Sequence, residues 1–217
     1  MQKRCDSITC DRSMARVSQE ILDGLITDCT QKPYEIVVSK WIVEKTPAIF
    51  HDDREEFLRI KSLIAKGLKV DMCSVVFVGS SCTGFSLNPD KDFKEFDDNS
   101  DIDIAIISHH HFNIAWRWMR QVDLSTLRSK ERYAVKQHRL HYVFDGTIAT
   151  DLVLPLMPFG AEWGTVLASI SSEPVFGGRD IHFRLYQDHK SLIDYHVNNV
   201  KNNMPSMLGV EAKDEQL

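Results

Sequence analysis

Two carboxylates lie two residues apart within an apolar run of the chain, at Asp101 and Asp103. In an extended strand alternate side chains point to the same face, so the two carboxylates project together while Ile102 and Ile104 point into a core. Neighbouring carboxylates repel each other, which destabilises the fold unless a cation joins them. Mg²⁺ prefers oxygen ligands and often shares them with substrate phosphates. The pattern therefore predicts a magnesium site on a strand.

A Gly-Ser turn ends the apolar run that precedes this one, at Gly79, Ser80 and Ser81. Residues 79–84 have the GxxxxG spacing of a P-loop, but Phe85 follows where a P-loop has the lysine that reaches the terminal phosphates, so this motif is excluded. A Gly-Ser turn at the end of a strand can still bind phosphate through backbone N–H groups and hydroxyls. We expect this turn to contact a phosphate group.

Together the two elements resemble the nucleotidyltransferase superfamily related to DNA polymerase β, in which a strand ending in Gly-Ser precedes a strand of alternating Asp and hydrophobic residues. The family has a third carboxylate on a neighbouring strand, and Asp151, within Thr150-Asp151-Leu152-Val153, is similar to that motif. The resemblance covers residues 70–158, with the three motifs in the family's order. The loop 81–100 is longer than is usual and resembles an insert of minimal bacterial nucleotidyltransferase-like proteins.

The resemblance implies transfer of a nucleoside monophosphate from an NTP, by default ATP, to a hydroxyl acceptor with release of pyrophosphate. Two Mg²⁺ ions would be held by Asp101 and Asp103, and Asp151 would complete the ion that activates the acceptor. Ser80 would hold a β- or γ-phosphate. The acceptor could be a protein side chain, a small molecule or an RNA end.

Two alternatives stay open beside this interpretation. One is a binding module that keeps the fold without catalysis, and the other is a metal-dependent nuclease that uses the same carboxylates. By analogy with the family, a partner protein in phage defence or in a toxin–antitoxin pair is also expected.

The expected fold is α/β, in the α+β sense: a small mixed sheet of the nucleotidyltransferase type with flanking helices. We divide the chain into an N-terminal helical segment, 1–70, the nucleotidyltransferase core, 71–158, and a helix and strand extension packed on that core, 159–217. Hydrophobic spacing predicts a first helix capped by Ser13 and a third capped by Asp52.

Further along the chain, residues 142–144 and 148–154 have the composition of two antiparallel strands around the turn Asp145-Gly146, which would place Asp151 on a strand. Residues 181–185 alternate as a short strand. Asp188 can cap a last helix, and the tail is expected to be mobile from Met204 onward.

The composition is that of an ordinary globular protein, with 43% hydrophobic and 26% charged residues. A net charge of −5 argues against a protein that coats nucleic acid, but a cationic run within residues 117–139 either binds a triphosphate or nucleic acid or is simply an exposed surface. The five cysteines include no CxxC pair, so neither a zinc site nor a disulfide framework is expected. Without a signal-type or membrane-spanning apolar run, the expected location is cytoplasmic, with no membrane partner.

Overall fold

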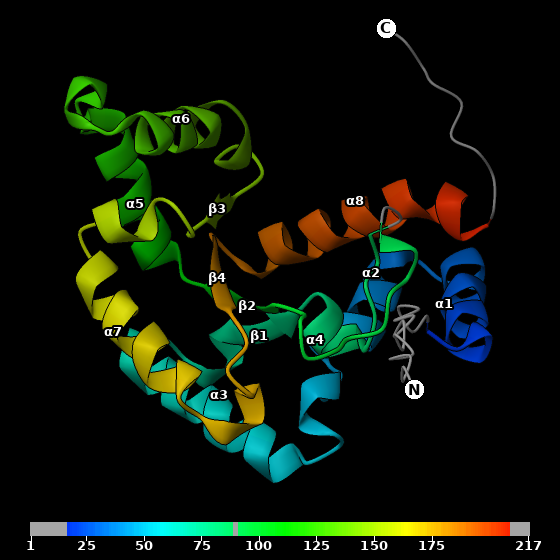
Figure 1. The fold of residues 1–217 in the computed structure, drawn as a ribbon. Coiled ribbons are helices and arrows are strands. Elements are labelled where there is room, and N and C mark those ends of the chain that lie inside the picture. Colours follow the sequence, from blue (N-terminus) through cyan, green and yellow to red (C-terminus); the bar gives the residue numbers. More distant parts are fainter. Residues whose placement is uncertain (1–16, 89–90, 209–217) are drawn as a thin grey trace, which may run out of the picture.

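The computed structural model describes residues 17–88 and 91–208. At its centre lies a mixed four-stranded sheet with the order β1-β2-β4-β3 (Figure 1). Strand β2 (Ile102–Ile107) pairs antiparallel with β1 (Val75–Val78) and parallel with β4 (Ile181–Tyr186), and β4 pairs antiparallel with β3 (Thr147–Ala149). The mixed helix and sheet fold expected from the sequence is confirmed. The last strand in the sequence, from the segment 159–217, lies inside the sheet.

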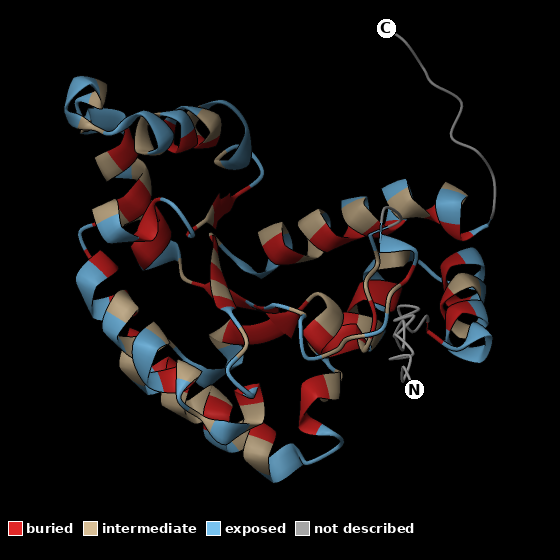
Figure 2. Ribbon diagram, viewed as in Figure 1, coloured by how far each residue is buried: buried red, intermediate tan, exposed pale blue. Residues whose placement is uncertain are grey.

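Helices α3 (Arg54–Leu68) and α7 (Gly160–Ser171) cover one face of the sheet. The face is apolar, and buried rings meet across it: the Phe57 and Phe77 centroids lie 6.0 Å apart, as do those of Trp163 and Phe183. The two helices approach closely at Gly67, where an added Cβ would lie 2.8 Å from a Val166 methyl group. Figure 2 shows the buried residues gathered on the sheet and on the inner sides of these helices.

The opposite face of the sheet is covered by helices from both ends of the described chain. Helix α2 (Tyr34–Val38) continues as the π-helix η1 (Ser39–Val43), and both it and α1 (Gln19–Gln31) pack on α8 (His189–Met207). Asp28 is buried between these helices and accepts hydrogen bonds from Lys32, Lys40 and Trp41. Helices that precede the first strand and the helix that follows the last strand therefore form one layer on this face.

A helical arm lies beside β3 at the far end of the sheet (Figure 1). It consists of α5 (His109–Gln121), α6 (Ser129–Gln137) and the π-helix η6 (His138–Tyr142). The shorter helices of the described chain are η2 (Ala48–Phe50), η3 (Met72–Ser74), α4 (Ser80–Thr83), η5 (Leu124–Thr126), η7 (Leu154–Leu156) and η8 (Pro174–Phe176). No helix of residues 17–88 and 91–208 combines the length and apolarity needed to cross a membrane.

Several helix ends differ from those predicted. Asp53, not Asp52, caps α3, because its carboxylate accepts the backbone N–H of Glu56. The first helix begins at Gln19, and the predicted cap Ser13 lies outside the described residues. Asp188 caps α8 as predicted, by accepting the N–H of Ser191 at 2.7 Å. The prediction of a mobile tail from Met204 is wrong as far as Met207, since α8 continues to that residue with Met204 and Met207 buried.

The predicted pairing of strands around Asp145-Gly146 is wrong: residues 142–144 form no strand, and of 148–154 only 148–149 lie in a strand, β3, which pairs with β4. Residues 138–142 form a π-helix instead, and the following N–H groups of Val143 and Gly146 are accepted by carbonyls within the same turn. His138 is buried in this turn, with its two ring nitrogens 2.7 Å from Ala134 O and 2.9 Å from Ala149 O. These contacts hold the helical turn against the end of β3, so no strand forms there.

Candidate functional site

The strand register brings Asp103, His182 and the turn after β1 together at the same end of the sheet. Val78 is paired with Asp103, and Asp103 is paired with His182 on the next strand. Residues paired in this way point to the same face, so the carboxylate of Asp103 and the imidazole of His182 stand side by side, opposite the face that α3 and α7 cover. Gly79 follows Val78 at the same end.

Gly79 allows the turn after β1 to pass close to this carboxylate. Its φ of 65° lies in the region that residues with a Cβ rarely adopt. A Cβ at this position would also lie 2.9 Å from Asp103 Oδ2. The glycine is therefore required both by the backbone conformation and by the space that Asp103 occupies, and it places Ser80 at the mouth of a cavity.

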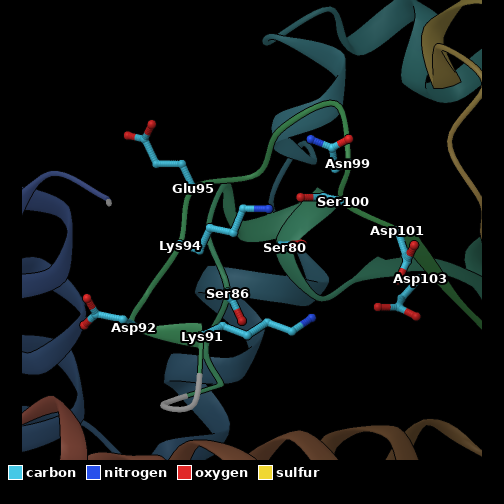
Figure 3. Close-up of a pocket in the computed structure, with 10 residues that line it drawn as sticks. All are labelled: Ser80, Ser86, Lys91, Asp92, Lys94, Glu95, Asn99, Ser100, Asp101 and Asp103. Carbon is cyan, nitrogen blue, oxygen red and sulfur yellow. The ribbon is translucent and has the colours of Figure 1, made fainter. Parts of the chain in front are cut away.

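That cavity has a volume of about 590 Å³ and is open to solvent beside β2. Figure 3 shows Asp101 and Asp103 on one side of it, Ser80 near the middle, and Ser86, Lys91 and Lys94 across from the two aspartates. The loop residues that line it are Ser86, Lys91, Asp92, Lys94, Glu95, Asn99 and Ser100. We call this space the nucleotide cavity, after the ligand that is proposed for it below.

The loop that walls the nucleotide cavity is folded as a hairpin-like strap. Phe85 bridges to Glu95, the Ser86 N–H donates to Lys94 O at 2.8 Å, and the Phe96 N–H donates to Gly84 O at 2.9 Å. Phe85 and Phe93 are buried and fix the strap to the body of the protein. Since its backbone is bonded on both sides, the strap presents its lysines at defined positions.

The two lysines of the strap, Lys91 and Lys94, line the nucleotide cavity. Lys94 pairs with Asp97 at 2.9 Å. Within the part of the chain that the structure describes, Lys91 has no ion-pair partner, and in Figure 3 its ammonium end lies on the side of the two aspartates. A cation without a partner beside two carboxylates favours an anionic ligand that carries its own metal ion.

The carboxylate of Asp103 is in an unfavourable state without a cation. It opens onto the nucleotide cavity, but desolvation by the surrounding protein raises its pKa above the usual value of 3.8. His182 and Arg184 oppose this rise, while the negative charges of Asp101 and Asp151 add to it. Binding of a cation at the carboxylate would offset this cost.

Asp151 lies in a turn after β3 and not on a strand, which corrects its predicted position. The strand β3 ends at Ala149, and Thr150 leaves it with its hydroxyl donating to Phe183 O at 2.5 Å. Because β4 lies between β2 and β3, Asp151 does not stand directly beside Asp103. Its Oδ1 is 3.2 Å from His182 Nδ1, and both side chains are about half exposed.

The predicted site residues therefore fall into separate groups. Gly79, Ser80, Asp101 and Asp103 meet at the nucleotide cavity. Ser81 points away from it: the side chain is buried and donates to Val78 O at 3.0 Å. Among residues 17–88 and 91–208, no three His, Cys, Asp or Glu side chains converge closely enough to hold a metal ion by themselves.

Sequence reasoning missed His182 and Lys91. The signal for His182 was present, since it alternates with the core residues Ile181 and Phe183 and must face away from them. The role of Lys91 had no such signal, because its position depends on the fold of the strap.

A comparison of the chain with protein-family models, with curated proteins and with solved structures finds no match. Function is therefore inferred from the side chains and the geometry of this site.

Proposed function

We propose that the protein is a Mg²⁺-dependent nucleotidyltransferase, which transfers a nucleoside monophosphate from an NTP, by default ATP, to a hydroxyl acceptor and releases pyrophosphate. The observation that carries the proposal is that Asp103 on β2 and Asp101, just before that strand, line one cavity together with Ser80 and two lysines, with the Gly79 turn against Asp103. Phosphoryl transfer depends on positioning and on neutralising charge, and these residues supply both.

The donor set at the nucleotide cavity fits magnesium. Asp101 and Asp103 offer hard oxygen ligands, and the desolvated carboxylate of Asp103 gains from a cation. Mg²⁺ usually takes one or two carboxylates and completes its coordination with water and substrate phosphates, so a third protein ligand is not required. When bound, it neutralises the charge on the reacting phosphate and the leaving group.

The chain's own residues have complementary roles on the triphosphate. Ser80, at the mouth of the cavity, donates its hydroxyl and the N–H groups of its turn to a β- or γ-phosphate. Lys91 and Lys94 neutralise the same phosphates from the strap. Together these groups hold the α-phosphorus in front of the row formed by Asp103 and His182.

The pair His182–Asp151 is placed to receive the proton of the acceptor. Its imidazole follows Asp103 in the sheet, and the carboxylate of Asp151 orients the ring through Nδ1. In the transfer step the acceptor oxygen bonds to the α-phosphorus while the bond from that phosphorus to the bridging oxygen breaks. Pyrophosphate leaves with the electron pair, and the hydroxyl proton passes to the other ring nitrogen of His182.

Binding of ATP tests the proposal before any acceptor is known. Thermal unfolding of the full chain is measured with Mg²⁺ and the non-hydrolysable analogue α,β-methylene-ATP, and we expect a rise in melting temperature. The double variant Asp101→Asn with Asp103→Asn should lose this rise. The control is Asp52→Asn, which removes an exposed carboxylate in a backbone conformation that asparagine tolerates.

Product analysis then separates the three interpretations. Incubation with labelled NTPs and Mg²⁺ should release pyrophosphate in a reaction that needs both aspartates. Cleavage of nucleic acid without pyrophosphate release would favour a nuclease. An absence of ATP binding, with the double variant behaving like the native chain, would leave a non-catalytic binding module.

A further inference from the structure

A second cavity is lined by both members of the His182–Asp151 pair. It has a volume of about 570 Å³, within the range of small-molecule sites, and lies between α7, η7 and the start of β4. We call it the α7 groove. Its lining residues are Thr150, Asp151, Leu154, Pro155, Gly160, Ala161, Gly164, Leu167, Ile181, His182 and Phe183.

Two glycines of α7 give the α7 groove its shape in different ways. Gly160 lets η7 approach the helix, since a Cβ at this position would lie 1.9 Å from Leu154 O. At Gly164 the same added atom would meet nothing within 4 Å. Gly164 therefore forms an open part of the groove, where a side chain would occupy ligand space without displacing protein atoms.

The α7 groove has few ionisable groups. Asp151 and His182 are the ionisable residues among its lining, and both are partly exposed. The hydroxyl of Thr150 is already used on Phe183 O. The remaining walls are apolar side chains and small residues, and none of the lining residues is a lysine or an arginine. The groove is thus an apolar channel that includes a proton acceptor.

We propose that the α7 groove is the acceptor subsite, and that it takes a small uncharged compound whose hydroxyl is carried on an apolar body. The inference rests on the proposed transferase function, because His182 lines the groove and is the strand partner of Asp103, which lines the nucleotide cavity. An RNA end does not fit, since nothing in the groove neutralises phosphates. The product is a phosphodiester between the nucleoside monophosphate and the alcohol.

The variant Gly164→Leu tests the groove directly. Leucine would project into the open space at this position and would also favour the helix more than glycine does. The matched control is Ala168→Leu, which adds a leucine on the same helix at an exposed position that does not line the groove. The probe is 2-phenylethanol, whose binding is measured by saturation-transfer NMR without nucleotide.

We expect 2-phenylethanol to bind the native chain and the control, and to lose binding in Gly164→Leu, while all three bind α,β-methylene-ATP with Mg²⁺ equally. With ATP present, the alcohol should raise pyrophosphate release in the native chain and the control only. Failure of the native chain to bind the alcohol, or equal binding by Gly164→Leu, overturns the inference.

The two proposals fail in different ways. If the alcohol binds in the α7 groove but ATP neither binds nor reacts, the transferase function is wrong and the groove stays a ligand site. If an RNA oligonucleotide or a hydroxyl-bearing peptide accepts the nucleotide equally well in Gly164→Leu, the transferase function holds and the acceptor class proposed here is wrong.

Discussion

Gly79 and Asp103 lie so close together that a side chain at Gly79 would collide with the carboxylate: an added methyl group would lie 2.9 Å from Asp103 Oδ2. The backbone φ of Gly79 is 65°. The turn proposed to bind the phosphates and the carboxylate proposed to bind the metal ion are therefore positioned by a single contact. A change at either residue should alter the other.

Gly79→Ala tests this coupling. The positive φ and the contact with Asp103 should together lower the free energy of unfolding by about 1–3 kcal/mol, and binding of Mg²⁺ and ATP should weaken. Urea unfolding and the nucleotide-induced shift in melting temperature measure the two effects. The control is Gly24→Ala, inside α1, where the added methyl group is 3.9 Å from Trp41 and should stabilise the helix. Equal behaviour of the two variants would contradict the prediction.

Asp103→Asn should raise the stability of the ligand-free protein while removing its response to Mg²⁺ and ATP. Desolvation and the charges of Asp101 and Asp151 disfavour the ionised carboxylate in the folded chain, as the raised pKa of Asp103 indicates. The neutral amide escapes that cost but is a poor magnesium ligand. Melting temperatures at pH 7 with and without the nucleotide check both parts. A destabilised variant would show that Asp103 has a structural partner instead.

Lys91→Ala should weaken the binding of α,β-methylene-ATP by about tenfold, or roughly 1.4 kcal/mol, because one charge-assisted contact to the triphosphate is lost. The loss should shrink as the salt concentration rises. Isothermal titration measures the dissociation constant, with Lys130→Ala on the exposed start of α6 as the control. An unchanged dissociation constant for Lys91→Ala would show that Lys91 does not contact the nucleotide.

The buried imidazole of His196 should make the fold sensitive to acid. Burial, with a smaller contribution from the charge of Arg184, lowers its pKa from 6.5 to about 4, and Tyr186 and Tyr195 pack on the ring. The unfolded chain binds the proton more readily, so stability is complete above pH 6.5 and is lost as the pH falls from 6.5 to 4. Over this interval the loss is about 3 kcal/mol.

His196→Leu removes this titration. Compared with the native chain, the variant should lose less stability between pH 7 and pH 5, by about 2 kcal/mol in urea unfolding. His109→Gln, at the exposed start of α5, is the control and should keep the native pH dependence. If His196→Leu follows the native curve, the acid sensitivity has another source.

The positions of Gly79, Asp101 and Asp103 could be predicted from the sequence because they depend on local rules. The alternation around Asp101 and Asp103 determines which face each residue occupies, and the glycine before Ser80 has a local conformational reason. The prediction that Ser81 contacts the ligand together with Ser80 did not take account of the helical turn of α4. In that turn the side chain of Ser81 points inward and donates a hydrogen bond to the carbonyl of Val78.

The positions of Asp151 and His182 could not be predicted in the same way, because they depend on which strands pair in the folded sheet. The apolar residues around Asp151 suggested a strand, but β3 is only three residues long and ends before it, where Thr150 donates its hydroxyl to the β4 carbonyl of Phe183. Which strand lies next to β2 is set by the position of β4, which no local pattern specifies. His182 acquires its place beside Asp103 only through that pairing.

The position of β4 also has a consequence for synthesis of the chain. A ribosome releases β1, β2 and β3 before Ile181–Tyr186, the strand that must be inserted between two of them. Until then β2 and β3 expose strand edges that can pair with other chains. An unfinished or C-terminally truncated product would carry Asp101 and Asp103 without His182, so we expect it to aggregate and not to act as a smaller enzyme.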